Sequence, residues 1–345
     1  MILVSIVNKE RSLKGGRFPI KFAAVILFSA IGFIIAILAN ILIPQISAGV
    51  TLEDYTLGGF TLNMNDAYRS VLALLAILYL GLGIYSAFDK ERQKKYQKRA
   101  QFRFAIGIAL ALWDLLGTKL QALPQPFFPG PAGIIRAFLM ESDFIWQNTL
   151  YSLRLFTAGF VLGVIFGVGT GILIGWFPKV YYWVSPVLNI TGVIPAVAWM
   201  PFALTLFPTA FSAAVFLIVI CVWFPVASLT ASGVQSTPKA QFEVARTLGG
   251  KTPYLVFRVA IPHAMPQIFT GINTASAFAF TTLVMAEMMG QPGGLGYYIN
   301  ASKVWSAYYK VFAAIIVMAI LFSLISKIVN LIEARVLRWK RGLLK

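Results

Sequence analysis

The stretch STPKAQFEVARTLGGKTPYLVFRVAIPHAMP, residues 236–266, lies between two long apolar segments and predicts two short helices. Thr237 is suited to cap the first helix, with Pro238 at its first helical position. Helical spacing gives this helix a small apolar face, with charged side chains elsewhere on its surface. That apolar face consists of Phe242, Ala245 and Leu248.

Two glycines separate the two predicted helices. Gly249 and Gly250 stand where a helix end favours a left-handed residue, and Thr252 begins the second helix before Pro262 stops it. Such a compact helix pair is suited to docking against another protein, although an ordinary loop with good capping has the same signals. A DNA-binding helix-turn-helix is disfavoured, because both ends join apolar segments within a few residues.

The composition is that of a membrane protein. Of the 345 residues, 59% are hydrophobic and 12% are charged, and the mean hydropathy is +0.79, whereas a soluble domain carries about a quarter charged residues. The net charge of +17 does not indicate nucleic-acid binding, because the cations form short runs beside long apolar segments. The single cysteine, Cys221, excludes an internal disulfide and a cysteine metal cluster.

Segment lengths predict eight membrane spans, since a spanning helix needs about 20 mostly apolar residues. The first segment is too long for the core of a cleavable signal peptide, which is about 7–15 residues, so we expect a retained helix. The third is short and contains Asp114, and it becomes a plausible span if it runs from near Phe102 to near Leu120. The predicted spans are 22–43, 71–88, 104–117, 151–177, 181–207, 210–232, 267–290 and 310–332.

The basic stretches support this count. Eight spans with both termini in the cytoplasm place every basic stretch on the cytoplasmic side, as membrane proteins prefer. Without the third span, two of these stretches would lie on the opposite side from the N-terminus. The basic stretches are 9–21, 89–103, 238–258 and 335–345.

Glycines recur at every fourth residue of the fourth predicted span, at positions 159, 163, 167, 171 and 175. On a helix this spacing forms a groove that another backbone can approach closely. The groove serves either packing within the chain or a surface that slides during gating.

Prolines interrupt the fifth predicted span. Pro195, Pro201 and Pro208 fall within or just after it, with Trp199 between the first two. Irregular backbone at membrane depth is tolerated only against protein or a watery path, and broken helices often mark a transport route. The alternative is a simple kink.

The loop pattern Glu243-Val244-Ala245, then Gly249, then Val259-x-Ile261-Pro262 resembles the EAA signature of ABC importer permeases, with Val244 replacing an alanine. Flanking stretches, among them IPAVAWMPFAL (194–204) and AEMMGQPGGLGYYI (286–299), are similar to the nitrate/sulfonate/taurine/bicarbonate branch.

The resemblance covers residues 102–345 and implies an all-α polytopic membrane protein, with a type I ABC importer (MetI-like) core of six helices. Residues 1–101 depart from it and add two N-terminal transmembrane helices and a basic linker.

The resemblance also implies partners. The coupling loop, 236–266, would insert into a cleft of an ABC ATPase subunit. A second copy of the chain would complete a homodimer in the inner membrane, and an extracytoplasmic binding protein would deliver a small anion such as nitrate, a sulfonate, taurine or bicarbonate. The implied coupling residues are Glu243, Ala245, Arg246, Gly249, Gly250 and Pro262.

The chain itself is expected to be neither an enzyme nor a cofactor carrier. It has no Gly-rich loop ending in Gly-Lys-Ser/Thr, so ATP and Mg²⁺ belong to the partner ATPase. His263, the one histidine, has no Cys, Asp or Glu at ligand spacing and predicts no metal site.

Charges inside the spans are candidates for function. Glu287 lies in an apolar span, where an acid is a functional hypothesis by default, although a structural pair with Arg154 is equally consistent with the sequence. The predicted translocation path contains Pro195, Trp199, Pro201, Glu287 and Arg154.

Two other functions compete with the importer. A secondary transporter would need coupling-ion carboxylates and usually an internal repeat, but Asp114 and Glu287 are the only acids within the predicted spans. A membrane enzyme is disfavoured because no catalytic cluster is evident.

Overall fold

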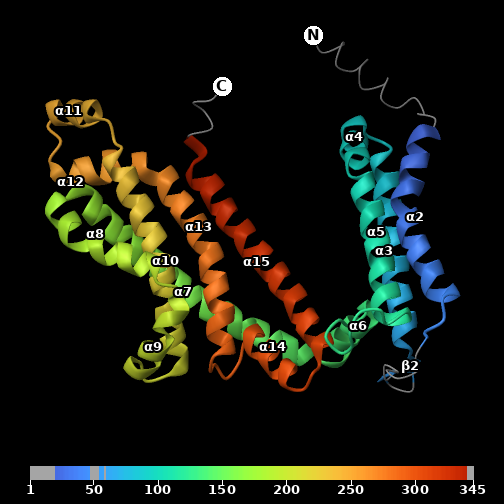
Figure 1. The fold of residues 1–345 in the computed structure, drawn as a ribbon. Helices are drawn as coiled ribbons and strands as arrows, with labels where there is room; N and C mark the ends of the chain where they lie inside the picture. The colour runs from blue at the N-terminus through green and yellow to red at the C-terminus, as the bar shows by residue number, and fades with distance from the viewer. Residues whose placement is uncertain (1–19, 47–53, 58–59, 340–345) are drawn as a thin grey trace, which may run out of the picture. The chain divides into compact units, whose positions relative to one another are not determined.

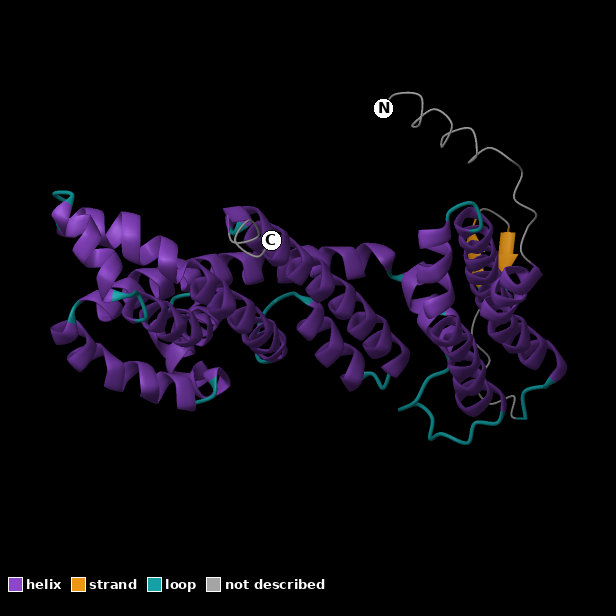
Figure 2. Cartoon of the chain, turned by 90° about the horizontal axis from the view of Figure 1, so that it is seen from above, coloured by secondary structure: helices purple, strands orange, loops and turns teal. Residues whose placement is uncertain are grey.

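The computed structural model describes residues 20–46, 54–57 and 60–339. Figures 1 and 2 show an almost entirely helical chain, so the predicted all-α fold is confirmed. Residues 9–19 of the first basic stretch and residues 340–345 of the last one lie outside the described residues.

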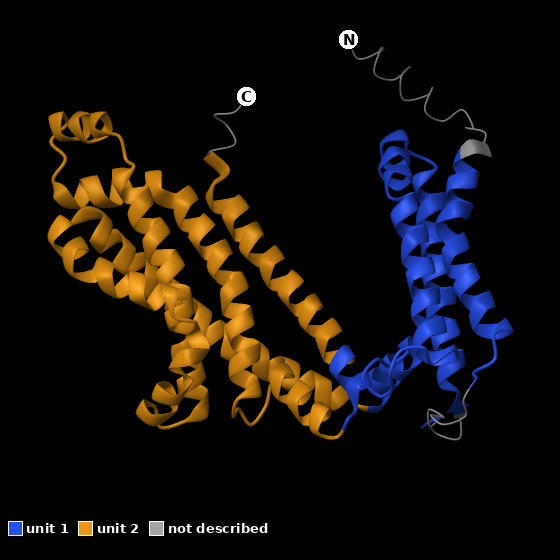
Figure 3. Cartoon of the chain, viewed as in Figure 1, with its two compact units in different colours: residues 1–140, 306–312 blue, residues 141–305, 313–345 orange. Residues whose placement is uncertain are grey.

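The chain divides into two compact units (Figure 3). Unit 1 contains residues 1–140 with 306–312, and unit 2 contains residues 141–305 with 313–345. The segment 306–312 is therefore continuous along the chain with unit 2 but packs in unit 1.

Unit 1 contains a bundle of three long helices. A side chain on Gly107 of α5 would meet the backbone of Gly32 of α2, so this glycine pair lets the two helices touch. Phe33, Tyr68 and Leu72 fill the bundle core and are almost fully buried. The elements are α2 (Ile20–Leu42), the antiparallel strands β1 (Tyr55–Leu57) and β2 (Phe60–Leu62), α3 (Met64–Ser86), α4 (Lys90–Lys98), α5 (Ala100–Asp114), the π turn η2 (Leu115–Lys119) and α6 (Pro131–Met140).

A buried polar network accommodates Asp114 within the third span. Asn40 Nδ2 donates to Asp114 Oδ2 at 2.7 Å, and Arg69 Nε donates to Asn40 Oδ1 at 2.7 Å. A buried carboxylate is tolerated when it is hydrogen-bonded in this way. The apolar helical path therefore continues over Ala100–Lys119, 20 residues, which confirms the longer version of this span.

Unit 2 is also helical, and its longest helix, α7, has 35 residues. Figure 1 shows α11 at one end of the unit and both α9 and α14 at the other. The elements are α7 (Ser142–Trp176), α8 (Pro178–Val193), the 3₁₀ turn η3 (Ala196–Trp199), α9 (Met200–Leu206), α10 (Ala210–Gln235), α11 (Lys239–Thr247), α12 (Thr252–Tyr254), the π turn η4 (Leu255–Ala260), α13 (Ile261–Met288), α14 (Leu295–Val304) and α15 (Tyr308–Val336), whose first turn packs in unit 1.

The glycine column of α7 packs against α10. A Cβ added to Gly163 would lie 2.6 Å from the Cβ of Val222, and one added to Gly167 would lie 2.7 Å from that of Val226. The other three glycines meet α10 in the same way, each opposite a β-branched side chain. The interpretation as packing within the chain is thus confirmed, and the close approach is one that small residues permit. The full pairing is Gly159 with Ile218, Gly163 with Val222, Gly167 with Val226, Gly171 with Thr230 and Gly175 with Val234.

Seven helices among the described residues are long and apolar enough to cross a membrane. The predicted span 181–207 is broken rather than continuous, as its prolines suggested, because α8 and the η3–α9 segment are bent by 103°; counted as one span, this pair brings the number among the described residues to the predicted eight. Ile194 has extended backbone angles, φ −77° and ψ 120°, as expected for a residue that precedes a proline. Three predicted starts were late by seven residues or more, since α3 begins at Met64, α7 begins at Ser142 and the helical path into α13 begins at Thr252.

The packing boundary also differs from the predicted domain boundary. The sequence separates 1–101 from 102–345, whereas α5 packs with α2 and α3, and the units divide between Met140 and Glu141. The separation by function, an extension followed by a six-helix core, stays a prediction.

Candidate coupling site and translocation helices

The helix α11 begins one residue later than predicted. Pro238, with φ −60° and ψ 134°, occupies the N-cap position, and Lys239 is the first helical residue. The predicted cap by Thr237 is wrong: its Oγ1 is buried and has no hydrogen-bond partner in the described part of the chain. The extended backbone of Pro238 separates Thr237 from the helix that it was expected to cap.

The end of α11 is a Schellman motif, in which the last turn is closed by two backbone hydrogen bonds. Gly250 N donates to Ala245 O at 2.8 Å, and Gly249 N donates to Arg246 O at 2.9 Å. Gly249 has φ +83°, a conformation that glycine adopts without steric cost. The glycine turn predicted from the sequence is therefore confirmed.

One side of α11 packs on the ends of three long helices. The Phe242 ring meets Trp176, the last residue of α7, with ring centroids 5.5 Å apart. Phe242 also packs on a buried cluster that includes Val234 of α10 and Ala264 of α13, and Ala245 is buried. A displacement of α11 would therefore act directly on α7, α10 and α13.

The opposite side of α11 is open. Val244 is 60% exposed and Leu248 is 84% exposed, and the side chains of Glu243 and Arg246 are exposed beside them. Leu248 therefore does not share the buried face expected of it. Apolar side chains this exposed, beside charged ones, are a feature of protein-binding surfaces.

A groove with a volume of about 700 Å³ borders this side of α11. Pro262, predicted as a coupling residue, lines the groove together with Val244, so the structure brings the two ends of the motif together. His263 also lines it, and no cluster of metal-ligating side chains occurs among the described residues. The lining residues are Ala240, Gln241, Val244, Arg258, Val259, Pro262, His263 and Trp339.

The second predicted helix does not end at Pro262. One helical path runs from Thr252 to Met288, through the π turn η4 and into α13. Pro262 stands in the first turn of α13, where its missing N–H disturbs the helix least. The π turn immediately before it changes the hydrogen-bonding register, which lets the chain pass the proline without stopping.

Glu287 is 1% exposed and lies at the end of α13. Its Oε2 accepts the backbone N–H of Gly296 at 2.8 Å, in the first turn of α14. The first N–H groups of a helix lack partners within the helix, and a carboxylate there is favoured by the helix dipole. Glu287 therefore acts as an N-terminal cap for α14.

Two side chains of α7 complete this cap. Asn148 Oδ1 accepts the N–H of Gly294 at 2.9 Å, and Ser152 Oγ accepts the N–H of Leu295 at 2.9 Å. Gly294 has φ +109°, and any side chain there would overlap the Glu287 carboxyl group. The start of α14 is thus held by α7 and α13 together.

Arg154 does not form the proposed ion pair with Glu287. Its side chain is exposed, and its guanidinium lies 5.4 Å from the centroid of the Phe211 ring. Ion pairs elsewhere among the described residues include Arg69–Asp66 and Arg92–Asp89.

The broken helix contains the other residues of the predicted path. Pro195 precedes η3, and Pro201 lies in the first turn of α9. Trp199 is half-buried against Phe202, with ring centroids 6.3 Å apart, and its Nε1 has no hydrogen-bond partner in the described ranges. No hydrogen bond, ion pair or ring contact within those ranges joins Trp199, Glu287 and Arg154 to one another, so the structure does not bring the predicted path residues into direct contact.

Sequence reasoning missed Asn148 and Ser152. Their signal was their spacing: polar residues four positions apart share one face of a helix, and both lie in a long apolar segment. Gln291 was missed as well, and its Oε1 accepts from the Tyr151 hydroxyl at 2.9 Å. These contacts fix the turn between α13 and α14 against α7.

Known proteins resemble about two thirds of this chain. A protein of Bacillus subtilis (strain 168) named as an aliphatic sulfonates transport permease, SsuC, is 31% identical over 68% of this chain and 86% of its own length. The taurine transport system permease protein TauC of Escherichia coli (strain K12) is 26% identical over 68% and 87%. The nitrate import permease protein NrtB of Leptolyngbya laminosa is 30% identical over 65% and 75%.

A family model agrees with these relatives and covers more than half of the chain. It describes the binding-protein-dependent transport system inner membrane component and matches residues 159–341, from the glycine column of α7 through α11 to the end of α15. This chain belongs to that family of ABC transporter permeases, in the nitrate/sulfonate/taurine/bicarbonate branch.

Proposed function

We propose that this chain is the membrane-spanning subunit of an ATP-driven importer that passes a small anion from a binding protein into the cytoplasm. The observation that carries the proposal is α11, a short helix with an exposed apolar edge whose other side packs on α7, α10 and α13. A partner that moves α11 would move these helices.

The proposed partner at α11 is an ABC ATPase subunit. Full burial of a leucine side chain contributes about 1.5–3 kcal/mol, and Leu248 is the more exposed of the two apolar residues on the open side. Glu243 and Arg246 add charged contacts around it. ATP and Mg²⁺ would bind to that subunit, and a second copy of this chain would face a second ATPase.

Orientation follows from the same end of unit 2. Trp339, beyond α15, lines the groove beside α11, so the C-terminal end of α15 and the coupling loop lie together. Basic stretches flank both, which favours the cytoplasmic side. We therefore propose that the C-terminus lies in the cytoplasm and that the turn between α13 and α14 lies on the side that receives the binding protein. The basic stretches 9–21 and 89–103 favour the cytoplasm for the N-terminus as well.

The proposed route follows the broken helix. Pro195 lies in the break between α8 and η3, Pro201 lies in the first turn of α9, and irregular backbone at this depth is stable against protein or water. Trp199 lies at the bend, and its buried Nε1 has no hydrogen-bond partner among the residues that the structure describes; this donor is available to an anion if the bend opens. Arg154 supplies a positive charge, while Glu287 contributes by fixing the start of α14.

The anion class rests on the relatives, whose names specify aliphatic sulfonates, taurine, nitrate and bicarbonate. A direct test reconstitutes the chain with its ATPase and binding protein in proteoliposomes and measures ATP-dependent uptake of these four solutes. Uptake of at least one, abolished without ATP, is expected. Uptake that persists without ATP but follows an ion gradient would instead indicate a secondary transporter.

The coupling contact is tested with a matched pair of exposed leucines. Leu248→Ser removes the apolar contact on α11, and Leu206→Ser makes the same change on α9, where Leu206 is 59% exposed. Loss of about 1.5–3 kcal/mol weakens ATPase binding by roughly 10- to 150-fold. We expect this loss for Leu248→Ser alone; equal ATPase binding by both variants would refute α11 as the docking element.

A further inference from the structure

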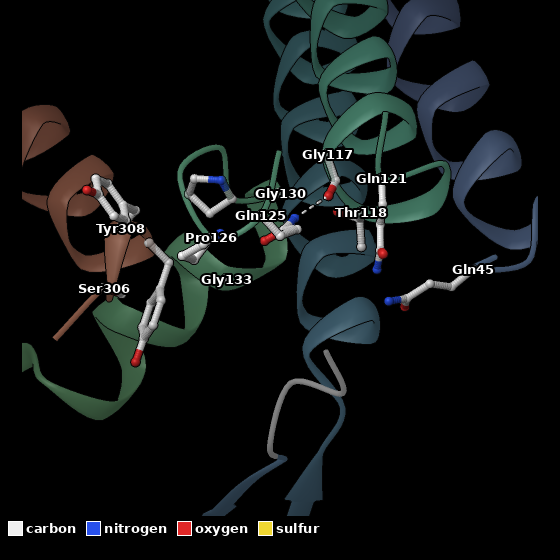
Figure 4. Close-up of a pocket in the computed structure, with 12 residues that line it drawn as sticks. Gln45, Gly117, Thr118, Gln121, Gln125, Pro126, Gly130, Gly133, Ser306 and Tyr308 are labelled. Carbon is white, nitrogen blue, oxygen red and sulfur yellow. Dashed lines mark hydrogen bonds between the residues drawn. The ribbon is translucent and has the colours of Figure 1, made fainter. Parts of the chain in front are cut away.

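Unit 1 contains a pocket with a volume of about 330 Å³ (Figure 4). We call it the glutamine pocket, and its polar wall consists of Gln45, Thr118, Gln121, Ser306, Tyr308 and Tyr309. Figure 4 shows Gln45 and Gln121 extending toward the same space beside η2. Because a water molecule occupies about 30 Å³ in the liquid, this volume suits a molecule of roughly ten non-hydrogen atoms.

The wall of the pocket is uncharged. None of its lining residues is Lys, Arg, Asp, Glu or His. A charged ligand taken from water requires a paired opposite charge, and the nearby Arg136 guanidinium is already placed over the Tyr309 ring, 5.6 Å from its centroid. The anions of the proposed route are therefore poor candidates for this pocket.

The polar groups of the wall can both donate and accept hydrogen bonds. A carboxamide offers two donors and an acceptor, and each hydroxyl offers one donor. Another glutamine, Gln125, is already used for structure, since its Nε2 donates to Gly117 O at 2.8 Å. The Gln45 side chain makes no hydrogen bond to another described residue. The Tyr308 and Tyr309 rings add apolar surface beside these groups.

Backbone strain is concentrated at the same pocket. Within the described ranges, the non-glycine residues with positive φ are Gln121, at 48°, and Ser306, at 53°, and both line the pocket. Such conformations cost energy and cluster at ligand sites. Ser306 also begins the segment 306–312, which packs in unit 1 and connects α14 to α15.

We propose that the glutamine pocket binds a small uncharged solute with several hydroxyl groups, and that its occupancy regulates transport through the link between α14 and α15. The hydroxyl groups of such a solute can both donate hydrogen bonds to the carboxamide groups and accept hydrogen bonds from them. Its C–H groups can pack against the tyrosine rings. The site shares no residue with the proposed anion route. Its regulatory part rests on the proposed function, whereas its binding part does not.

Binding is tested with the full chain in lipid nanodiscs, using D-glucose and myo-inositol as uncharged probes and nitrate and bicarbonate as anionic ones. Calorimetry and thermal unfolding should show saturable binding of at least one uncharged probe. Gln45→Met keeps the length of the side chain and removes its amide, so binding should weaken about three- to tenfold, as for one lost hydrogen bond. Gln97→Met, on the exposed surface of α4, is the matched control and should bind normally.

A second variant guards against misfolding at Gln45. Tyr309→Phe keeps the ring and removes one hydroxyl group, and it should also weaken binding. Three results would each overturn the site. Neither uncharged probe binds, or Gln45→Met and Gln97→Met bind the probe equally well. The third result is that an anion binds and that this binding is lost in Gln45→Met. Saturation with the bound probe should change the uptake rate in proteoliposomes; an unchanged rate would overturn the regulatory part while the binding part stands.

Discussion

Gly249 offers the sharpest test of the coupling loop. Its φ of +83° closes the Schellman end of α11, and no atom lies within 4 Å of a Cβ added there. A side chain at position 249 therefore has room. The effect of a substitution comes from the cost of holding a non-glycine residue at this φ. Gly249→Val places a β-branched residue in a conformation that it strongly disfavours, whereas Gly249→Asn places a residue that tolerates it.

The size of the effect follows from the length of α11. A non-glycine residue in this conformation costs about 1–3 kcal/mol, with valine at the upper end. α11 has nine residues, and helices shorter than about 12–15 residues are marginal by themselves. Its position thus depends on the glycine turn and on the packing of Phe242 and Ala245. Release of the turn by valine should lower the population of the docked form by roughly 5- to 150-fold.

Co-purification of the ATPase and ATP-driven uptake measure this population. We expect Gly249→Val to be inserted and abundant, because it lies outside the spans, and to lose both ATPase binding and uptake. Gly249→Asn should retain most of both. The same loss in both variants would show that something other than φ matters at this position, and normal uptake by Gly249→Val would refute the coupling role of the loop.

Three further predictions concern orientation, packing and capping. In a Cys221→Ser background, an impermeant thiol reagent applied to intact cells should label Thr56→Cys and not Lys95→Cys. Gly163→Val should lower the thermal unfolding midpoint, because overpacking at the α10 contact costs about 1–3 kcal/mol. Glu287→Ala should lower it as well, since an unpaired buried N–H costs about 1–3 kcal/mol, and Glu287→Gln should restore it by supplying an amide oxygen.

Each of these predictions has a contrary result. Labelling of Lys95→Cys alone would reverse the orientation of unit 1. The matched control for packing is Gly169→Val, since no atom lies within 4 Å of a Cβ added at Gly169; equal destabilisation by both valines would contradict the α7–α10 contact. A Glu287→Gln variant as unstable as Glu287→Ala would show that the carboxylate charge is indispensable.

The sequence predicted the features that depend on local chemistry. The lengths of the apolar segments predicted the membrane helices. The glycines at every fourth residue of α7 predicted a close contact with another helix. Gly249 and Gly250 predicted the end of α11, because a residue in the left-handed conformation at a helix end is usually glycine.

Features that depend on hydrogen-bonding register or on distant partners were not predictable. Pro262 was expected to stop a helix, but the π turn η4 carries the chain past it. The opposite charges of Arg154 and Glu287 suggested an ion pair. In the structure, the Glu287 carboxylate instead accepts a hydrogen bond from the backbone N–H of Gly296. Asp114 weakened the third span in the sequence, and only the contact with Asn40, 74 residues away, explains its place.

The glycine column has a mechanical consequence. Five close contacts join α7 to α10 along most of their shared length. We therefore expect the two helices to move as one rigid pair, with little sliding of one against the other. At 1.5 Å per residue, α7 extends about 50 Å. Its last residue, Trp176, touches α11, and near its beginning Asn148 and Ser152 hold the start of α14. If α11 is the coupling element, a displacement of α11 is therefore expected to displace α14 at the other end of the unit.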